Sequence, residues 1–346
     1  DGYWSRGLGD VYKRQKFSMA VKNYGEAIRE AFEYLLDKYP NVFTIGQGLW
    51  SPWYVGNSMT ELEVKFGKDR VIDTPVSEQA TTGAALGSSL CGYRPIVIHP
   101  RVDFALLAVD QMVNQSAKWC HMLGGQSSAP VTFRCIINRG GEQGAQHSQS
   151  LYSWFAHIPG LRVITPYSPQ DARDLLISSV LCDDPVMYID DRWLYDLETD
   201  LPPIKEYDLA SQGAKKIREG TDITLVGNSH GTHLCMEAAK QLESQNIQCE
   251  VIDLRILNPL RIEVLFDSLK RTRNLCVIDE DWRNCGMAGE IIASVIESCP
   301  MGTLLTSPLR LTLPDAPAPT SKSLEQIYYL KVEEICQKIK MLLDCV

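Results

Sequence analysis

Three side chains of different chemistry each follow a predicted strand. These residues and the strands before them are Glu78 after 71–73, Phe104 after 95–98 and His147 after 131–137. Ligands of open parallel sheets bind outside the carboxyl ends of the strands, so we expect all three side chains at one rim. A carboxyl group, an aromatic ring and an imidazole could together hold a flat, hydrogen-bonding heterocycle and transfer protons around it.

Each of the three residues has an ordinary structural role when taken alone. A Glu such as Glu78 in a first helical turn usually complements the helix dipole. A single Phe usually belongs to a core, and a single His is usually structural. Their common position at one rim favours a functional site but identifies no reaction.

The elements that would position these side chains alternate regularly along the chain. Continuous apolar strands separated by amphipathic helices indicate parallel sheets that are covered on both faces. We therefore predict an α/β fold of two domains, each a mainly parallel sheet with helices on both faces. The pattern also predicts a long helix over 104–123, a helix over 148–157 and a strand over 304–306.

The periodic pattern divides the chain into four segments. Residues 1–18 show no helical or strand period and resemble adaptor-derived sequence, with Met19 as a natural start. Residues 19–195 form the first expected domain and 214–346 the second. Between them, 196–213 contains Pro202-Pro203 and several acids without a period, which is typical of a linker.

Composition excludes some functions. The net charge of −9 over 346 residues argues against general nucleic-acid binding. The sequence contains no run of 18 apolar residues, so it predicts no membrane span. The 11 cysteines include no CxxC pair and no zinc-type spacing with histidine, which fits a reducing compartment such as the cytoplasm or, in a eukaryote, the mitochondrial matrix.

Several motifs resemble those of the beta subunit of thiamine diphosphate-dependent 2-oxo acid dehydrogenases. They are Asp73-Thr74-Pro75-Val76-Ser77-Glu78, Gly92 to Ile96, Asp110-Gln111, Ala145-Gln146-His147-Ser148-Gln149, Pro159 to Val163, Cys249 to Arg255, the Trp282/Gly286/Glu290 segment and Leu313 to Ser321. The resemblance covers nearly everything after Met19. It implies a transketolase-like pyrimidine-binding domain followed by a transketolase C-terminal domain.

The resemblance also implies roles for the three rim residues. Glu78 matches the carboxyl group that hydrogen-bonds the pyrimidine ring of thiamine diphosphate and favours its reactive tautomer. Phe104 matches the ring that stacks on that pyrimidine. His147 matches a histidine near the reacting carbon, where it could stabilise an alkoxide or transfer a proton.

Half of such a site is missing from this sequence. The superfamily holds the diphosphate and its Mg²⁺ with a Gly-Asp-Gly motif followed by Asn, and the sequence contains no Gly-Asp-Gly. The resemblance therefore implies that an alpha-type subunit supplies the diphosphate and Mg²⁺ site, in an α2β2 heterotetramer. A lipoyl-bearing acyltransferase is the expected further partner.

Three positions depart from the usual family pattern. Gln47 stands where many members carry a Glu, and a Gln cannot transfer a proton. His99 and Arg101 lie in a stretch that is usually acidic and then aromatic. We interpret Gln47 as a cofactor-site residue, and His99 and Arg101 as substrate-binding candidates, with Arg101 as an anion clamp. Drift on a solvated rim is the alternative, and it extends to the unusual loop 139–144.

Three functions remain open from the sequence. The first is the beta-type subunit of a decarboxylating 2-oxo acid dehydrogenase that passes on the acyl group or activated aldehyde. The second is a stand-alone carboligase or a split transketolase-like half, which the substitutions at Gln47, His99 and Arg101 slightly favour. The third is a non-catalytic assembly or regulatory subunit, which the presence of Glu78, Phe104 and His147 disfavours.

Overall fold

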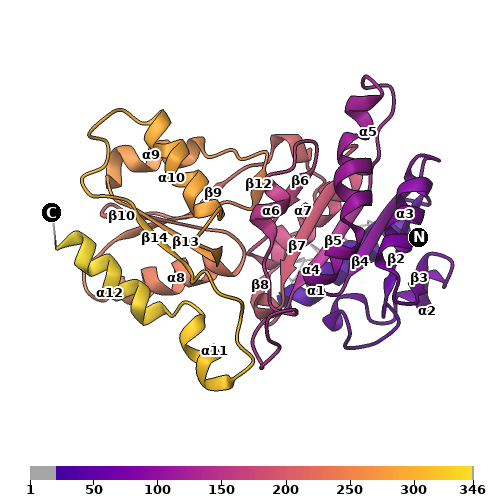
Figure 1. Ribbon diagram of the computed structural model, residues 1–346, viewed down its shortest axis with the longest axis horizontal. Coiled ribbons are helices and arrows are strands. Elements are labelled where there is room, and N and C mark those ends of the chain that lie inside the picture. The colour runs from indigo at the N-terminus through magenta and orange to yellow at the C-terminus, as the bar shows by residue number, and fades with distance from the viewer. Residues whose placement is uncertain (1–20, 345–346) are drawn as a thin grey trace, which may run out of the picture.

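Two mainly parallel sheets lie side by side, each with helices on both faces, in the computed structural model of the protein (Figure 1). The structure describes residues 21–344. It confirms the predicted two-domain α/β architecture. The interpretation of residues 1–18 as non-native or disordered lies outside the described residues.

The first sheet has seven strands in the order β12-β6-β7-β5-β4-β2-β3. They are β2 (Val42–Gln47), β3 (Val71–Thr74), β4 (Arg94–His99), β5 (Thr132–Ile137), β6 (Arg162–Ile164), β7 (Val186–Asp191) and β12 (Ile256–Asn258). Six strands are parallel, and β12 runs antiparallel to β6. Every residue of the central β5 and β7 is buried, as expected for strands covered on both faces.

Helices before and after these strands cover the first sheet. They are α1 (Tyr24–Lys38), α2 (Leu62–Phe66), α3 (Glu78–Ser89), α4 (Val102–Ala105), α5 (Ala117–Met122), α6 (Tyr152–Ala156) and α7 (Pro169–Leu181). The start of α1 is set by a capping box between Asn23 and Glu26. The helix predicted over 104–123 is a helical run interrupted by a 3-10 turn and a π-helical turn over Asp110–Ser116. The helix predicted over 148–157 is confined to α6, because residues 148–151 belong to the preceding loop.

The second sheet has the order β14-β13-β10-β11-β9. Its strands are β9 (Lys215–Arg218), β10 (Ile223–Gly227), β11 (Cys249–Asp253), β13 (Leu275–Trp282) and β14 (Leu309–Leu313), and its helices are α8 (His230–Glu243), α9 (Glu263–Thr272), α10 (Met287–Ser298), α11 (Lys322–Tyr328) and α12 (Val332–Leu343). Only β9 of these strands is antiparallel to its neighbour. The strand predicted over 304–306 is wrong: these residues lie outside any strand, and the strand is β14, a few residues later. A run of three residues is too short for its apolar character to distinguish a strand from a turn.

The segment predicted as a linker packs against the first sheet's helices. Within it, β8 (Glu198–Asp200) pairs antiparallel with β1 (Val21–Asn23). Arg173 of α7 also donates to the backbone oxygen of Pro202 over 2.8 Å. A proline-rich stretch without a period is thus held by backbone contacts that the sequence pattern did not reveal.

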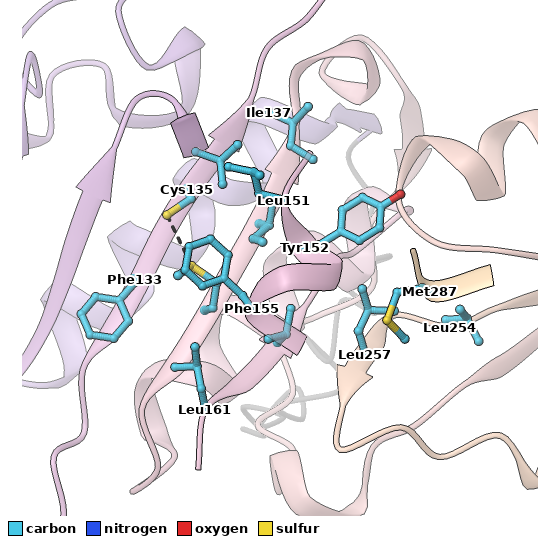
Figure 2. Packing of buried hydrophobic residues seen from close by; sticks show 14 of the residues in the cluster. Phe133, Cys135, Ile137, Leu151, Tyr152, Phe155, Leu161, Leu254, Leu257 and Met287 are labelled. Atoms are coloured by element: carbon cyan, nitrogen blue, oxygen red, sulfur yellow. Dashed lines mark hydrogen bonds between the residues drawn. The ribbon is translucent and has the colours of Figure 1, made fainter. Parts of the chain in front are cut away.

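One hydrophobic cluster joins the two sheets. It runs from Phe133 and Cys135 in β5, across Phe155 in α6, to Leu257 and Met287 in the second half of the chain (Figure 2). In this cluster β12 and α10 pack against α6, so the second half of the chain contacts the first sheet's helices directly. No helix within residues 21–344 is long and apolar enough to cross a membrane.

Candidate active site

The predicted site residues lie at the carboxyl ends of four neighbouring strands. The strand order β5-β4-β2-β3 places these strand ends next to one another. Gln47 ends β2, His99 ends β4, Glu78 begins the helix after β3, and His147 lies in the loop after β5. Chain segments separated by up to 100 residues thus meet at one rim, as the parallel topology requires.

A small pocket lies between the ends of β2 and β4 and the start of α3. Gln47, Glu78 and His99 all line it. It holds about 10 Å³, which is room for about one water molecule. Gly46 also lines it, and the position requires glycine because a Cβ there would collide with the backbone oxygen of Ile98 in β4. A ring-sized ligand would therefore rest against this pocket and need a second wall from elsewhere.

Glu78 is the first residue of α3, and its side chain is half-buried. Its carboxylate makes no hydrogen bond or ion pair with another residue of the described chain (residues 21–344). Its position in the first turn places it near the positive end of the helix dipole. The carboxylate is thus available to a ligand that rests on the pocket.

Phe104 and His147 form a ring pair at the same rim of the sheet. Their ring centroids are 5.2 Å apart, and the rings are nearly perpendicular at 88°. Both side chains are half-buried. This edge-to-face arrangement is one that aromatic pairs prefer, and it orients the imidazole relative to the rim.

His99 is held as a neutral side chain in the floor of the pocket. It is 2% exposed, and its Nε2 lies 3.3 Å from the hydroxyl of Thr82 in α3. Burial lowers its pKa to about 4, so the imidazole is uncharged near neutral pH. It can exchange hydrogen bonds with a ligand but cannot attract an anion by charge.

Arg101 points its guanidinium at the loop over residues 138–147, which we call the His147 loop. Its Nη1 donates to the backbone oxygens of Asn138 and His147 over 2.9 and 3.2 Å. Its Nη2 donates to the side-chain oxygen of Gln143 over 2.8 Å. The donors proposed from the sequence as an anion clamp are therefore engaged within the chain.

Asp103 is a rim residue whose role the sequence did not indicate. Its Oδ1 accepts from the backbone and the side-chain nitrogens of Gln149, over 3.2 and 2.9 Å. Its Oδ2 is buried without a partner among the described residues, and burial raises its pKa. In the sequence, only its position next to Phe104 pointed to a role for Asp103. Its partner, Gln149, is 46 residues away in the chain.

A second polar cluster lies where the two sheets face each other. Arg139, two residues after β5 and within the His147 loop, donates to the carboxylates of Asp191 and Glu280, and the second contact measures 2.9 Å. His230, at the start of α8, lies 2.7 Å from Glu280 through its Nδ1. Burial raises the pKa of Glu280, but Arg139 and His230 outweigh it and lower the pKa to about 2. We call these four residues the interdomain cluster; no sequence motif linked them.

The chain matches two family models in order. Residues 21–196 match the pyrimidine binding domain of transketolase, and residues 212–335 match the C-terminal domain of transketolase. The first match alone covers more than half of the chain.

Curated relatives match over most of their lengths. The mitochondrial pyruvate dehydrogenase E1 component subunit beta of Bos taurus is 33% identical over 310 residues, which is 89% of this chain and 83% of the relative. The acetoin:2,6-dichlorophenolindophenol oxidoreductase subunit beta of Bacillus subtilis is 36% identical over 322 residues, or 89% and 93% of the two chains.

A solved structure confirms the fold. A split-gene transketolase, crystallised as an inactive beta4 tetramer, superposes with a TM-score of 0.74 at 19% identity. The match covers 93% of this chain and 98% of that one. At this identity the likeness concerns the architecture alone.

Proposed function

This chain belongs to the E1 beta-subunit family of thiamine diphosphate-dependent dehydrogenases, and we propose that with an alpha-type subunit it decarboxylates a 2-oxo acid and passes on the acyl group or activated aldehyde. The observation that carries this proposal is the carboxylate of Glu78. It is unpaired within the described chain, it begins α3, and it lines a pocket at the carboxyl edge of a parallel sheet. Bound thiamine diphosphate would supply the electron sink for decarboxylation.

The rim fits the pyrimidine part of that cofactor. Glu78 offers a carboxyl group to a ring nitrogen, and Phe104 offers an aromatic surface beside it. Gly46, which has no side chain, lines the same pocket. Gln47 and the neutral His99 add hydrogen-bonding groups to the same pocket.

The rim does not fit the diphosphate. Within residues 21–344 no group of three or more His, Cys, Asp or Glu side chains could hold a metal ion, and the sequence lacks Gly-Asp-Gly. We infer that the alpha-type subunit holds Mg²⁺ and the diphosphate, and that it forms the second wall of the pocket in an α2β2 heterotetramer.

His147 is proposed as the second catalytic residue. Its imidazole makes no side-chain hydrogen bond within the described chain, and Phe104 holds it edge-on at the rim. It is free to transfer a proton or to donate to a developing oxyanion. His99 and Arg101 were proposed as substrate-binding residues; the contacts of Arg101 to the His147 loop support a positioning role for it instead.

The assembly and its setting follow from the same proposal. A lipoyl-bearing acyltransferase would accept the acyl group, in the cytoplasm or the mitochondrial matrix. We also propose that residues 19–195 and 214–346 are the two domains and 196–213 their linker. Because β12 pairs with β6 at the edge of the first sheet, a strand from the second half of the chain extends the sheet of the first domain.

A carboligase or split transketolase-like enzyme is the second candidate. Gln47 favours it, because a Gln beside Glu78 in the pocket cannot relay a proton. The relatives named for acetoin show that this family includes beta subunits whose named substrate is not a 2-oxo acid. A non-catalytic subunit would have no need for the unpaired carboxylate of Glu78.

The decisive experiment is reconstitution with an alpha-type subunit of this family. The assembled protein, given Mg²⁺ and thiamine diphosphate, should reduce 2,6-dichlorophenolindophenol with a 2-oxo acid, and each subunit alone should not. Carboligation without dye reduction would favour the second candidate. In calorimetry, micromolar binding of thiamine diphosphate by this chain alone would contradict the shared site.

A further inference from the structure

The His147 loop has a backbone that cannot hold its shape unaided. Gly140, Gly141, Glu142 and Gly144 all have positive φ angles, at 79°, 65°, 64° and 75°. Glycine tolerates such angles, but a residue with a Cβ is strained there. The conformation of Glu142 therefore requires external contacts that hold it in place.

Arg101 makes the contacts on one side of the loop. Its three hydrogen bonds reach the first residue of the loop, Asn138, then Gln143 in the middle and His147 at the end. Charge-assisted hydrogen bonds of this kind are stronger than neutral ones. One guanidinium thus ties together both ends of a ten-residue loop.

Glu325, from the second half of the chain, makes the contact on the other side. It lies in α11 and is 9% exposed, and its carboxylate accepts from the backbone nitrogen of Glu142 at 3.2 Å through each oxygen. Thr320 packs nearby: a Cβ at Gly144 would lie 2.5 Å from its hydroxyl oxygen. The strained residue is therefore the one that Glu325 holds.

We propose that Arg101 and Glu325 are positioning residues that clamp the His147 loop from opposite sides and so fix the imidazole at the rim. The proposal rests on the role of His147 in the proposed function. It makes the second domain a structural part of the active site, since α11 lies about 180 residues after the loop in the sequence. It also assigns Arg101, which departs from the family pattern, to the loop and not to the substrate.

Hydrogen–deuterium exchange on the full chain tests the clamp without a measurement of enzyme activity. Arg101→Ala and Glu325→Ala should each raise amide exchange in peptides over 138–149 by about 10-fold, because each releases one side of the loop. Arg101→Lys and Glu325→Gln should restore protection in part, since each keeps one hydrogen-bonding group. Arg162→Ala and Glu333→Ala, which alter side chains away from the loop, are the matched controls. Unchanged loop exchange in both alanine variants would overturn the proposal.

A double-mutant cycle in the assembled enzyme separates positioning from substrate binding. Arg101→Ala should lower kcat by about 10- to 100-fold without changing the affinity for thiamine diphosphate, because small misplacements of a catalytic group are costly. In the His147→Ala background the same substitution should have almost no further effect. A full additional loss in that background would instead show that Arg101 contacts the substrate. If the wild-type assembly has no turnover, the proposed function fails. The exchange result would still show whether Arg101 and Glu325 hold the His147 loop.

Discussion

The rim of the first sheet and the interdomain cluster occupy equivalent places, yet they are built in opposite ways. Both lie at the carboxyl ends of parallel strands. At the rim, Glu78 and His147 have side chains without hydrogen-bonding partners in the described chain. In the interdomain cluster, Arg139, Asp191, Glu280 and His230 form a continuous buried network.

Burial explains the difference. Arg139, Asp191 and Glu280 have side chains that are at most 2% exposed, and a charge at that depth must be paired. Glu78 and His147 remain accessible and keep their hydrogen-bonding capacity for a ligand. Position at a strand end therefore does not by itself define a site. The availability of the side chain does, and it predicts that changes in the cluster lower stability while changes at the rim lower turnover.

Arg139→Met should have the largest effect, on stability. Removing one partner from a buried ion network leaves uncompensated charge and costs about 3–5 kcal/mol. Denaturant unfolding of the chain measures it, with the exposed Arg283→Met as the control, expected within about 0.5 kcal/mol of wild type. A loss below about 1 kcal/mol for Arg139→Met would mean that the cluster does not hold the domains together.

Glu78→Gln should leave stability unchanged and lower turnover of the assembled enzyme by on the order of 10²-fold or more, because a Gln cannot exchange a proton with a ring nitrogen. Circular dichroism and dye reduction provide the two readouts. Glu219→Gln, at the far edge of the second sheet, is the matched control. Activity close to wild type would remove Glu78 from the site and, with it, the basis of the comparison.

Asp253→Asn should show a pH-dependent gain in stability. Asp253 ends β11; burial, and then the charge of Asp171, raise its pKa from 3.8 to about 8. Because the pKa of Asp253 is raised in the folded protein, its protonated carboxyl group contributes stability that is fully present below pH 3.8. This contribution is lost as the pH rises through 8.

Asn carries no such titration and can still accept from Thr232, whose hydroxyl donates to Oδ1 over 2.9 Å. From pH 6 to pH 7, the unfolding free energy of the variant should therefore rise relative to that of wild type by up to about 1.4 kcal/mol. Unfolding free energies at both pH values measure this gain. A difference between variant and wild type that is the same at both values would show that Asp253 is ionised in the folded protein.

Phe104→Leu should have the smallest effect. It removes a stacking surface worth about 0.5–1.5 kcal/mol, so the assembled enzyme should bind thiamine diphosphate about 2- to 12-fold more weakly at nearly normal stability. Activation curves against cofactor concentration measure it, with Phe66→Leu in α2 as the control. If Phe104→Leu destabilises the chain while cofactor affinity is retained, Phe104 belongs with the core and not with the rim.

The fold was largely predictable because its signals are local. The continuous apolar runs of β5 and β7 and the strand–helix rhythm predicted two mainly parallel sheets, which the structure confirms. The errors also have local causes. A three-residue apolar run at 304–306 could not be told from a strand, while β8 and β12 are short strands defined by partners far away in the sequence.

The chemistry of the rim could be read from the sequence: which acid, ring and imidazole follow which strands, and which family carries them. Side-chain types and their order along the chain carry that information. Which charges are paired, and what holds the His147 loop, depends on how the elements pack in three dimensions. Arg139 meets Glu280 across 141 residues, and Glu142 meets Glu325 across 183. Contacts of that separation form when the sheets pack together, and periodicity, which reports on neighbours along one element, has no means of encoding them.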